Sequence, residues 1–343
     1  MKTLALDIGG ANIKSVHSAG VAQCEPFALW QQSDQLLAQL QNLAEQIPPF
    51  DRLAVTMTAE LCDCFATKQQ GVFHVLDASE AFAGHRPVWV WLTEGRFADL
   101  DTARANPIGC AAANWHALAT FVAQCFPQGM SLLIDCGSTT TDLIVLDGGH
   151  VAAQGVTDDQ RLATGELVYL GASRTPLMAL AQQISWDNRT YRLIAEHFAT
   201  TADVYLLTGD LPNQPDRIDT ADGRPQTTRC AAARLVRMIG ADLDRLNIDD
   251  ARRLARVFGQ IVQDRLIEAL DQVLAGRRPD RLIVSGSGEF IASDAARAAQ
   301  PELAMESLAV RFGQAFSNAA CAHALIHLCE DWNPKQLGER MEP

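Results

Sequence analysis

Long apolar runs are missing from this sequence. No stretch of about 18 apolar residues occurs, which argues against a membrane-spanning helix. The first ten residues, MKTLALDIGG, also lack the apolar stretch of a secretory signal, because an aspartate interrupts them at position 7. The sequence therefore predicts a cytoplasmic protein with no membrane partner.

Positive charge is scarce as well. The chain has 28 lysine and arginine residues against 41 aspartate and glutamate residues, so its formal net charge is 28 − 41 = −13. Proteins that bind nucleic acid or anionic membranes need a positive footprint for phosphate groups, and the basic residues here are scattered. This excludes nucleic acid as the main partner. Any phosphate-bearing ligand has to be held locally, by backbone amides and a metal ion.

Paired cysteine motifs are also lacking. Nine cysteines, an odd number, fall mostly inside apolar segments, where a thiol behaves as a small apolar side chain, and we expect them to be reduced. Cys62 and Cys64 are separated by one residue, whereas structural zinc sites prefer two residues between paired cysteines. A loop near the functional site is the preferred interpretation of this segment.

One short sequence pattern occurs twice in the chain. Residues 135–142 read DCGSTTTD between two apolar runs, and a shift of 135 − 7 = 128 positions aligns Asp7 with Asp135 and Gly9 with Gly137. A repeated strand, Asp-x-Gly turn and strand predicts two similar halves. We expect residues 1–128 and 129–330 to form these halves, with a loop-rich insertion at about 155–245, and residues 331–343 to form a C-terminal tail.

The two turns suit phosphate binding. Small residues let several backbone amides converge on one point, and hydroxyl groups add donors without adding charge. Asp7 and Asp135 are the predicted ligands of a magnesium ion, which is typically held by one or two carboxylates and phosphate oxygens. The predicted phosphate-binding residues are Gly9, Gly10, Lys14, Gly137, Ser138, Thr139, Thr140 and Thr141. The alternatives are ordinary hairpin turns and, for Lys14, a lysine that points to solvent.

Apolar periodicity predicts the local elements that matter below. We expect a strand at FALW (27–30), a helix over 33–47 behind a Ser33 cap and a mostly buried helix over 107–126. A long helix is expected over 250–276, with Val257 and Ile261 among the residues of its apolar face. A third turn rich in glycine, SGSG at 285–288, follows an apolar strand.

The paired Asp-Gly turns with a late Gly-x-Gly turn resemble the actin-like ATPase superfamily of sugar kinases, heat-shock chaperones and actin. The resemblance covers essentially the whole chain. It implies an α/β fold of duplicated ribonuclease-H-like domains with a cleft between them. It also implies that two turns hold phosphates and that the third, with Gly286 and Gly288, lies along the adenosine.

More specific segments resemble the hydantoinase-A-related proteins of the tetrahydromethanopterin-linked C1-transfer pathway. They are LDIGGANIK (6–14), VTMTAELCDCF (55–65), AANW (112–115), DCGSTTTD (135–142), ELVYLGASRTP (166–176), TADVYLLTGD (201–210) and DTADGRP (219–225). Archaeal members of this family are similar to the synthase of methanofuran biosynthesis. The resemblance therefore implies a transferase that joins an aminomethylfuran diphosphate to the phenol of gamma-glutamyltyramine and releases pyrophosphate. An alanine- and glutamine-rich composition with few lysines favours a bacterial member, with methylofuran as the cofactor and an acceptor of the tyrosine type.

The implied reaction needs a proton acceptor, because a phenol has a pKa of about 10. The candidate catalytic residues are Asp7, Asp135, Glu60, Asp63 and Asp142, and His116 is a further candidate base. Glu60 and Asp63 lie in the family-specific loop TAELCDCF. A lone histidine after an apolar segment, such as His116, is more often a core residue.

Several other residues are candidates for substrate contact. They are Asn114, Trp115, Arg174, Asp222, Gly223, Gly286 and Gly288. The indole of Trp115 could stack on a phenol or furan ring. Asp222 and Gly223 lie in a loop suited to a metal or a substrate amine, and Arg174 and Arg224 could bind a carboxylate or phosphate, although solvent exposure is the ordinary state of arginine.

Two other classes of function stay open at this point. An ATP-dependent small-molecule kinase, or an amidohydrolase related to hydantoinases and oxoprolinases, would require nucleotide binding. A non-enzymatic nucleotide switch would require a partner-binding surface. The use of ATP, the identity of the base, the tyramine or tyrosine type of the acceptor and a homodimeric state are likewise left open, since the implied ether-forming reaction needs no adenine.

Overall fold

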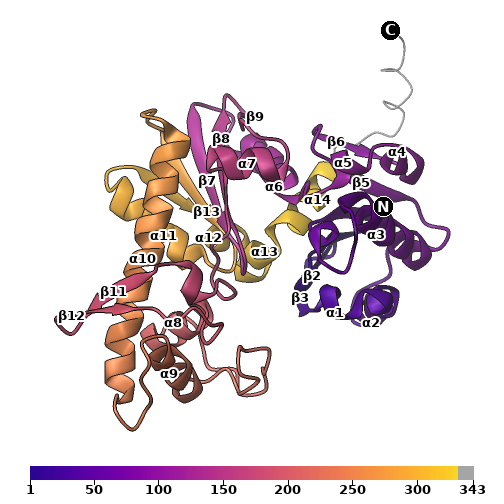
Figure 1. Cartoon of the computed structure of the whole chain (residues 1–343). Coiled ribbons are helices and arrows are strands. Elements are labelled where there is room, and N and C mark those ends of the chain that lie inside the picture. Colours follow the sequence, from indigo (N-terminus) through magenta and orange to yellow (C-terminus); the bar gives the residue numbers. More distant parts are fainter. Residues whose placement is uncertain (331–343) are drawn as a thin grey trace. The chain divides into compact units, whose positions relative to one another are not determined.

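The computed structural model describes residues 1–330, which form two compact units (Figure 1). The first unit comprises Met1–Ser131, Ile144–Arg161 and the segment that begins at Leu308, and the second comprises Leu132–Leu143 and Leu162–Ser307. The predicted tail at 331–343 lies outside the described residues.

A six-stranded sheet forms the centre of the first unit. Its order is β3-β2-β1-β4-β5-β6, and its strands are β1 (Thr3–Ile8), β2 (Asn12–His17), β3 (Val21–Pro26), β4 (Arg52–Met57), β5 (Val88–Leu92) and β6 (Arg96–Ala98). Strands β1, β2 and β3 are antiparallel neighbours, whereas β4 is parallel to both β1 and β5. Parallel neighbours need crossover connections. The crossovers contain α1 (Leu29–Gln32), η1 (Ser33–Gln35) and α2 (Leu36–Ala44), then η2 (Ala59–Leu61) and α3 (Lys68–Ala83).

Side-chain alternation along β1 separates core from site. Leu4, Leu6 and Ile8 are fully buried and belong to a cluster that includes Leu40 of α2 and Val72 of α3. Asp7 lies between them in sequence, so its side chain points to the other face of the sheet. Strand β1 therefore anchors the core with one face and presents a carboxylate on the other.

The remaining helices of the first unit follow the sheet. They are α4 (Leu100–Ala105), α5 (Pro107–Cys110), α6 (Asn114–Cys125), α12 (Leu308–Phe312), α13 (Gln314–Asn318) and α14 (Ala320–Glu330). Helix α14 packs against β1, β2 and β4 and against α6. From the sequence, residues 308–330 are expected in the second half, whereas the segment that begins at Leu308 belongs to the first unit. Periodicity marks a helix as amphipathic but does not say which sheet it covers, and the predicted boundary at residues 128 and 129 stays a prediction.

A second sheet repeats the order of the first five strands of the first sheet. Its order is β10-β8-β7-β13-β14, with β9 also paired to β8, and its strands are β7 (Met130–Cys136), β8 (Thr141–Asp147), β9 (His150–Val151), β10 (Leu167–Val168), β13 (Arg281–Ser285) and β14 (Ala304–Ser307). Strand β8 is antiparallel to β10, and β13 is parallel to β14. The predicted α/β class with duplicated ribonuclease-H-like sheets is confirmed.

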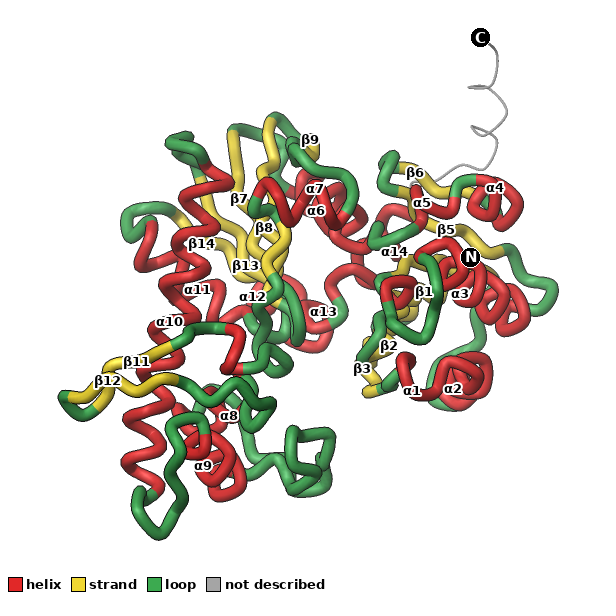
Figure 2. The backbone as a smooth tube through the Cα atoms, in the orientation of Figure 1, coloured by secondary structure: helices red, strands yellow, loops and turns green. Residues whose placement is uncertain are grey.

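The other elements of this part of the chain surround one long helix. They are α7 (Asp158–Thr164), η3 (Leu177–Ala179), α8 (Thr201–Thr208), α9 (Thr228–Arg237), α10 (Ile248–Leu274) and α11 (Glu289–Ala299), with a hairpin of β11 (Gln183–Trp186) and β12 (Arg189–Arg192). Helix α10 packs against α8, α9 and α11, and one end of the hairpin lies beside it (Figure 2). It begins with a capping box of Asn247 and Asp250. Among residues 1–330, none of the helices combines the length and low charge needed to cross a bilayer.

Three local predictions were wrong in detail. Residues 27–30 are not a strand, because the amides of Phe27 and Leu29 bond to Ala11 and Gly10 of the first Asp-Gly turn and α1 begins at Leu29. Ser33 lies in the short helix η1 and caps nothing, since α2 begins later without a side-chain cap. The helix over 107–126 is broken in two, because Ala112 adopts a left-handed backbone with φ of 47°.

Candidate active site

The first Asp-Gly turn connects β1 to β2. The Gly9 amide donates to the Asn12 carbonyl at 3.0 Å and closes the turn. A Cβ atom on Gly10 would lie 2.6 Å from the Cys62 sulfur, so this position requires glycine. Asp7 is 2% exposed, and its Oδ2 lies 3.5 Å from the Lys14 ammonium. Its Oδ1 has no hydrogen-bond partner among residues 1–330. The turn therefore combines close backbone approach with a buried carboxylate that still has an acceptor atom to offer.

The second turn repeats the hydrogen bonds of the first. The Gly137 amide donates to the Thr140 carbonyl at 2.8 Å, which is the Gly9 to Asn12 bond shifted by 128 positions. The Ser138 carbonyl accepts from the Arg174 amide, as the Gly10 carbonyl accepts from the Leu29 amide. The internal repeat seen in the sequence thus extends to individual backbone bonds.

A third equivalence links the loops that follow β4 and β13. The Thr58 amide donates to the Ile8 carbonyl at 3.0 Å, and the Gly288 amide donates to the Cys136 carbonyl at 2.8 Å. Each loop therefore lies against the strand end that carries its own Asp-Gly turn. The TAELCDCF loop and the SGSG turn occupy corresponding positions of the two sheets.

The SGSG turn contacts Asp135 directly. Ser285 Oγ donates to Asp135 Oδ1 at 2.7 Å. Gly286 has a φ of 95°, and a Cβ atom there would collide with the Cys136 carbonyl oxygen. A Cβ on Gly288 would lie 2.5 Å from the Cys136 sulfur. The SGSG turn therefore lies directly against Asp135, and ligand binding by Gly286 and Gly288 stays a prediction.

The hydroxyl groups of the second turn differ in their surroundings. Ser138, Thr139 and Thr140 are partly exposed, and the Ser138 and Thr139 oxygens lie 3.4 Å apart. Thr141 is fully buried, and its hydroxyl donates to the Leu170 carbonyl at 2.7 Å. Three of the four predicted hydroxyl donors therefore face the surface, while the fourth holds the following segment in place.

Glu60, in the loop after β4, has the most unusual environment of the candidate residues. It is 1% exposed, and neither carboxylate oxygen has a hydrogen-bond partner in the part of the chain that the structure describes. Burial raises the pKa of Glu60 from 4.5 to about 7, an effect that the nearby amides of Glu60 itself and Ala112 offset only in part. A carboxyl group in this state exchanges its proton near neutral pH.

Two charged side chains, Lys68 and Asp158, act on Glu60, and a third, Arg161, lies on Trp115. Lys68 Nζ lies 2.8 Å from Asp158 Oδ2, and these two charges act on the Glu60 carboxyl in opposite directions. Arg161, three residues after Asp158, is 1% exposed and its guanidinium lies 3.9 Å above the centre of the Trp115 ring. Sequence reasoning missed Lys68, Asp158 and Arg161, since none of them lies in a glycine-rich or family-specific segment.

Comparison with known proteins identifies the family. The family model described as hydantoinase/oxoprolinase matches residues 51–328. A synthase from Methanocaldococcus jannaschii is 34% identical over 295 residues, which span 85% of this chain and 88% of the relative. The chain belongs to the hydantoinase/oxoprolinase family. A second synthase, from Methanococcus vannielii, is 32% identical over 177 residues, or 52% of this chain and 79% of the relative.

Both relatives of this family member carry the same name. Each is called a synthase of a furan-2-yl methanamine that bears a gamma-glutamylaminoethyl-phenoxymethyl group. Among solved structures, a glucokinase of the ROK family from Streptomyces griseus, in complex with glucose and AMPPNP, aligns over 96% of this chain and 99% of its own, at 12% identity and a TM-score of 0.49.

In this hydantoinase/oxoprolinase family member, the side chains of the AANW segment mostly contact other parts of the protein. Trp115 is 2% exposed, and Arg161 covers one face of its ring. Asn114 Oδ1 accepts from the Trp115 amide at 2.8 Å. Burial and the Arg161 charge lower the pKa of His116 to about 4, and its Nδ1 lies 3.2 Å from the Thr120 hydroxyl. His116 is therefore a weak base, and substrate contact by Asn114 and Trp115 stays a prediction.

The DTADG loop also has a structural role. Asp222 Oδ1 accepts from Arg234 at 3.0 Å and its Oδ2 accepts from Arg224 at 2.6 Å. Although partial burial acts in the opposite direction, these hydrogen bonds hold the pKa of Asp222 below its usual value. Gly223 has a φ of 68° and closes the turn. Asp222 thus already binds two arginines, and a role in metal or amine binding stays a prediction.

The remaining candidates differ in their exposure. Asp63 is exposed in the loop that carries Glu60. Asp142 is 8% exposed on β8, and Arg174 is partly exposed beside the second turn. Asp7 and Lys14 belong to the first unit, while Asp135 and Asp142 belong to the second. Each Asp-Gly turn is consequently assembled within one unit.

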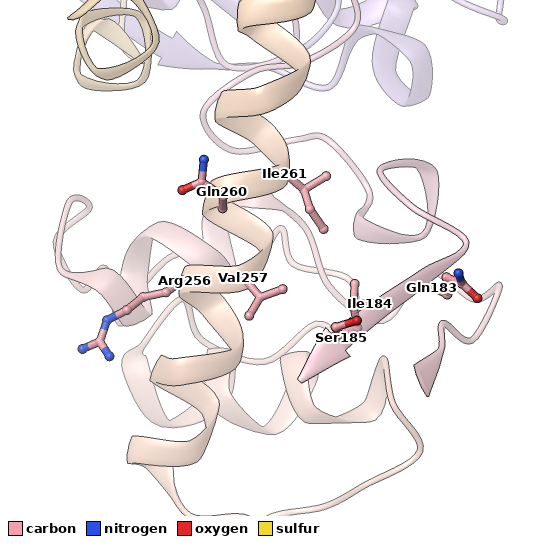
Figure 3. A pocket seen from close by; sticks show the side chains of 7 residues that line it. All are labelled: Gln183, Ile184, Ser185, Arg256, Val257, Gln260 and Ile261. Carbon is pink, nitrogen blue, oxygen red and sulfur yellow. The ribbon is translucent and has the colours of Figure 1, made fainter. Parts of the chain in front are cut away.

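A groove of about 490 Å³ occurs elsewhere in the second unit, between β11 and α10 (Figure 3). Val257 and Ile261 project from α10 on the side of Ile184, whereas Arg256 extends away from it (Figure 3). The two apolar residues are only partly buried, in contrast to Phe258 next to them. None of the predicted site residues lines this groove.

Proposed function

We propose that this chain forms an aryl ether between an aminomethylfuran diphosphate and the phenol of a gamma-glutamyl-tyramine or tyrosine-type acceptor, with release of pyrophosphate. The observation that carries the proposal is the 34% identity to the Methanocaldococcus jannaschii synthase across 85% of this chain. The product in that synthase's name contains a phenoxymethyl group on a furan, which is an ether between a phenol and a furan-bound methylene. The biological setting would be synthesis of a methanofuran-type cofactor for tetrahydromethanopterin-linked C1 metabolism.

The Asp-Gly turns supply the means to hold a diphosphate. Backbone amides that converge in a turn of small residues bind phosphate oxygens without a net positive field, which fits a chain with a formal charge of −13. Lys14 beside Asp7 adds one positive charge at the first turn, and Ser138, Thr139 and Thr140 add partly exposed hydroxyls at the second. At either turn, such donors would bind the pyrophosphate as it leaves, when its negative charge is greatest.

A magnesium ion fits the carboxylates of these turns. Within residues 1–330, no group of three histidine, cysteine, aspartate or glutamate side chains is arranged to hold a metal, which disfavours a site made of protein ligands alone. Magnesium commonly binds to one or two carboxylates and completes its shell with water and phosphate oxygens. Each unit offers one such carboxylate: Asp7, whose Oδ1 accepts no hydrogen bond from residues 1–330, in the first turn, and Asp135 in the second. Bound there, the ion would stabilise the negative charge that develops on the departing pyrophosphate.

A direct assay tests the proposal. The purified chain would be incubated with magnesium, an aminomethylfuran diphosphate and either a tyramine-type or a tyrosine-type acceptor. We expect the ether in a mass spectrum and one pyrophosphate per ether formed. The matched variant is Asp135→Asn, whose side-chain oxygen can still accept from Ser285. It should lose at least 100-fold in kcat and keep the thermal midpoint of the wild-type chain. Absence of ether with both acceptors would refute the proposal.

An ATP-dependent reaction is the second candidate. The family model that matches residues 51–328 is described as hydantoinase/oxoprolinase, and the Gly286–Gly288 turn lies against Asp135, where the superfamily resemblance implies an adenosine. Calorimetric titration with ATP and magnesium separates the two candidates. If ATP binds and ether formation still proceeds without it, the turn is a ligand site without a role in the reaction. If turnover depends on ATP, the diphosphate reaction is not sufficient.

A further inference from the structure

Glu60 lacks the partners that a buried carboxylate normally has. Both of its oxygens are covered; the amides of Glu60 and Ala112 lie near and favour the ionised form, but neither oxygen accepts a well-formed hydrogen bond from residues 1–330. Its backbone is firmly held, because a Cβ on Gly71 of α3 would approach the Glu60 Cα to 2.6 Å. An ionised carboxylate accepts hydrogen bonds and donates none, so the missing partner of Glu60 is a donor.

The charged and titratable groups around Glu60 do not neutralise it. Lys68 is the nearby cation, but its ammonium is paired with Asp158 at 2.8 Å. Asp158 itself acts on Glu60 as a like charge. Cys110, which faces Glu60, stays a neutral thiol, because burial and neighbouring carboxylates raise its pKa to about 12. Glu60 is therefore a carboxyl group whose proton affinity is set mainly by burial.

The position of Glu60 in its loop places it beside the first Asp-Gly turn. Two residues before it, the Thr58 amide bonds to the Ile8 carbonyl. Two residues after it, the Cys62 sulfur lies where a Cβ on Gly10 would be. Glu60 thus lies between two contacts with the turn that would bind the diphosphate. A nucleophile that attacks the carbon next to this diphosphate has to approach the same turn.

The other candidate bases are less suitable. His116 has a pKa of about 4, and its ring contacts Trp91 and Trp115 within the interior of the unit. Asp63 is exposed to solvent, where a carboxylate is a weak base for a phenol. The equilibrium constant for proton transfer from a phenol of pKa about 10 to a group of pKa about 7 is about one in a thousand. For an ordinary carboxylate it is about one in a million.

We propose that Glu60 is the proton acceptor for the acceptor's phenol, an inference that rests on the proposed ether-forming function. The phenol O–H transfers its proton to a Glu60 oxygen, and the phenol oxygen uses an electron pair to form the new bond to the furan-bound methylene carbon. The bond from that carbon to the diphosphate oxygen breaks, and its electron pair leaves with the pyrophosphate. Glu60 then returns the proton to water.

Substrate binding has to expose the Glu60 oxygens. The residues that follow Glu60 form a surface turn, in which Leu61, Asp63 and Cys64 are exposed. Cys62 and Phe65 of the same turn pack against the core, and Gly71 lies against the Glu60 backbone, so the exposed side chains are the part of the turn that can move at least cost. The acceptor would thus displace the turn and supply the missing hydrogen-bond donor.

The test compares Glu60→Gln with the wild-type chain and with Glu45→Gln, an exposed glutamate of the same unit. Donor and magnesium are kept constant, and the acceptors form a series of ring-substituted phenols of decreasing pKa. We expect Glu60→Gln to lower kcat at least 100-fold for the unsubstituted phenol, with the KM for the donor unchanged. The loss should shrink as the phenol becomes more acidic, and the wild-type rise of kcat around pH 7 should disappear. Glu45→Gln should behave as wild type.

Each outcome is decisive. If the wild-type chain forms no ether, the proposed function fails. If it forms ether and Glu60→Gln loses less than threefold with every phenol, the role of Glu60 is refuted. A third outcome would also refute this role: Glu60→Gln raises the KM for the donor at constant kcat, and the rise disappears when the donor lacks its amine. Glu60 would then be a ligand of the donor's ammonium group. Glu60→Asp guards against misfolding of the glutamine variant, because it keeps a carboxyl group and should retain a pH-dependent kcat.

Discussion

Replacing Glu60 by glutamine should remove a specific pH dependence from the stability of the protein. In the folded chain, burial raises the pKa of Glu60 from 4.5 to about 7, and unfolding returns it to its ordinary value. The folded state therefore binds this proton more tightly than the unfolded state. Rising pH consequently lowers the free energy of unfolding between about pH 4.5 and 7. At about 1.4 kcal/mol for each unit of pKa, this carboxyl group should cost the folded state about 3 kcal/mol above pH 7.

Urea unfolding at several pH values between 5 and 8 measures this effect. Tryptophan fluorescence is a suitable probe, because Trp91 and Trp115 are buried in the same unit as Glu60. The difference in unfolding free energy between Glu60→Gln and wild type should shift by about 3 kcal/mol in favour of the variant as the pH rises through this range. All other titrating groups are common to both chains, so they cancel in the difference.

The exposed control Glu45→Gln should give a difference that is constant with pH. Parallel curves for Glu60→Gln and wild type would show that the Glu60 carboxyl titrates normally in the folded chain. The argument that burial without a partner sets its proton affinity would then be wrong. A shift in the opposite direction would mean that a donor or cation stabilises the ionised form.

Two further predictions concern the second unit. Gly286→Ala should lower the free energy of unfolding in urea by more than about 2 kcal/mol, because the new Cβ meets the Cys136 carbonyl. The control Gly276→Ala should lower it by only about 1 kcal/mol, because Gly276 has a similar φ of 81° but no atom within 4 Å of the new Cβ. Equal costs would refute the close approach of the SGSG turn to β7. Arg234→Met should lower the free energy of unfolding by about 3–5 kcal/mol at pH 7, because it leaves the buried Asp203 and the partly buried Asp222 without their ion-pair partner. The loss should be smaller at pH 4. The surface pair variant Arg252→Met should cost under about 1 kcal/mol at either pH.

The repeated turns were predictable because they depend on backbone geometry. Glycine and small residues at fixed spacing mark such turns in the sequence itself, and the shift of 128 positions reappears in the bonds from Gly9 to Asn12 and from Gly137 to Thr140. The sequence also marked SGSG as a third glycine-rich turn after a strand, but gave no sign of its contact with Asp135. The sequence also indicated Glu60, but only as one acid among several.

The environment of Glu60 was not predictable, because it depends on residues far apart in the chain. Lys68 and Asp158 are 90 positions apart and form their ion pair only after folding. The break at Ala112, which brings an amide near Glu60, has no signal in an alanine-rich segment that favours a continuous helix. Likewise, periodicity assigned Val257 and Ile261 to a buried face, yet both line a groove beside β11 (Figure 3).

The matched loops after β4 and β13 show how one duplicated scaffold can acquire two chemistries. In both copies an amide of the loop bonds to the end of the neighbouring strand, at Ile8 and at Cys136. Two residues beyond that bond, one copy carries an acid, Glu60, and the other an aromatic ring, Phe290, which lies edge-on to Tyr205. After a duplication, backbone bonds can stay fixed while the side chains they display diverge. Exchanging these two loops between the two copies would therefore change the reactive side chain while the backbone keeps the same path.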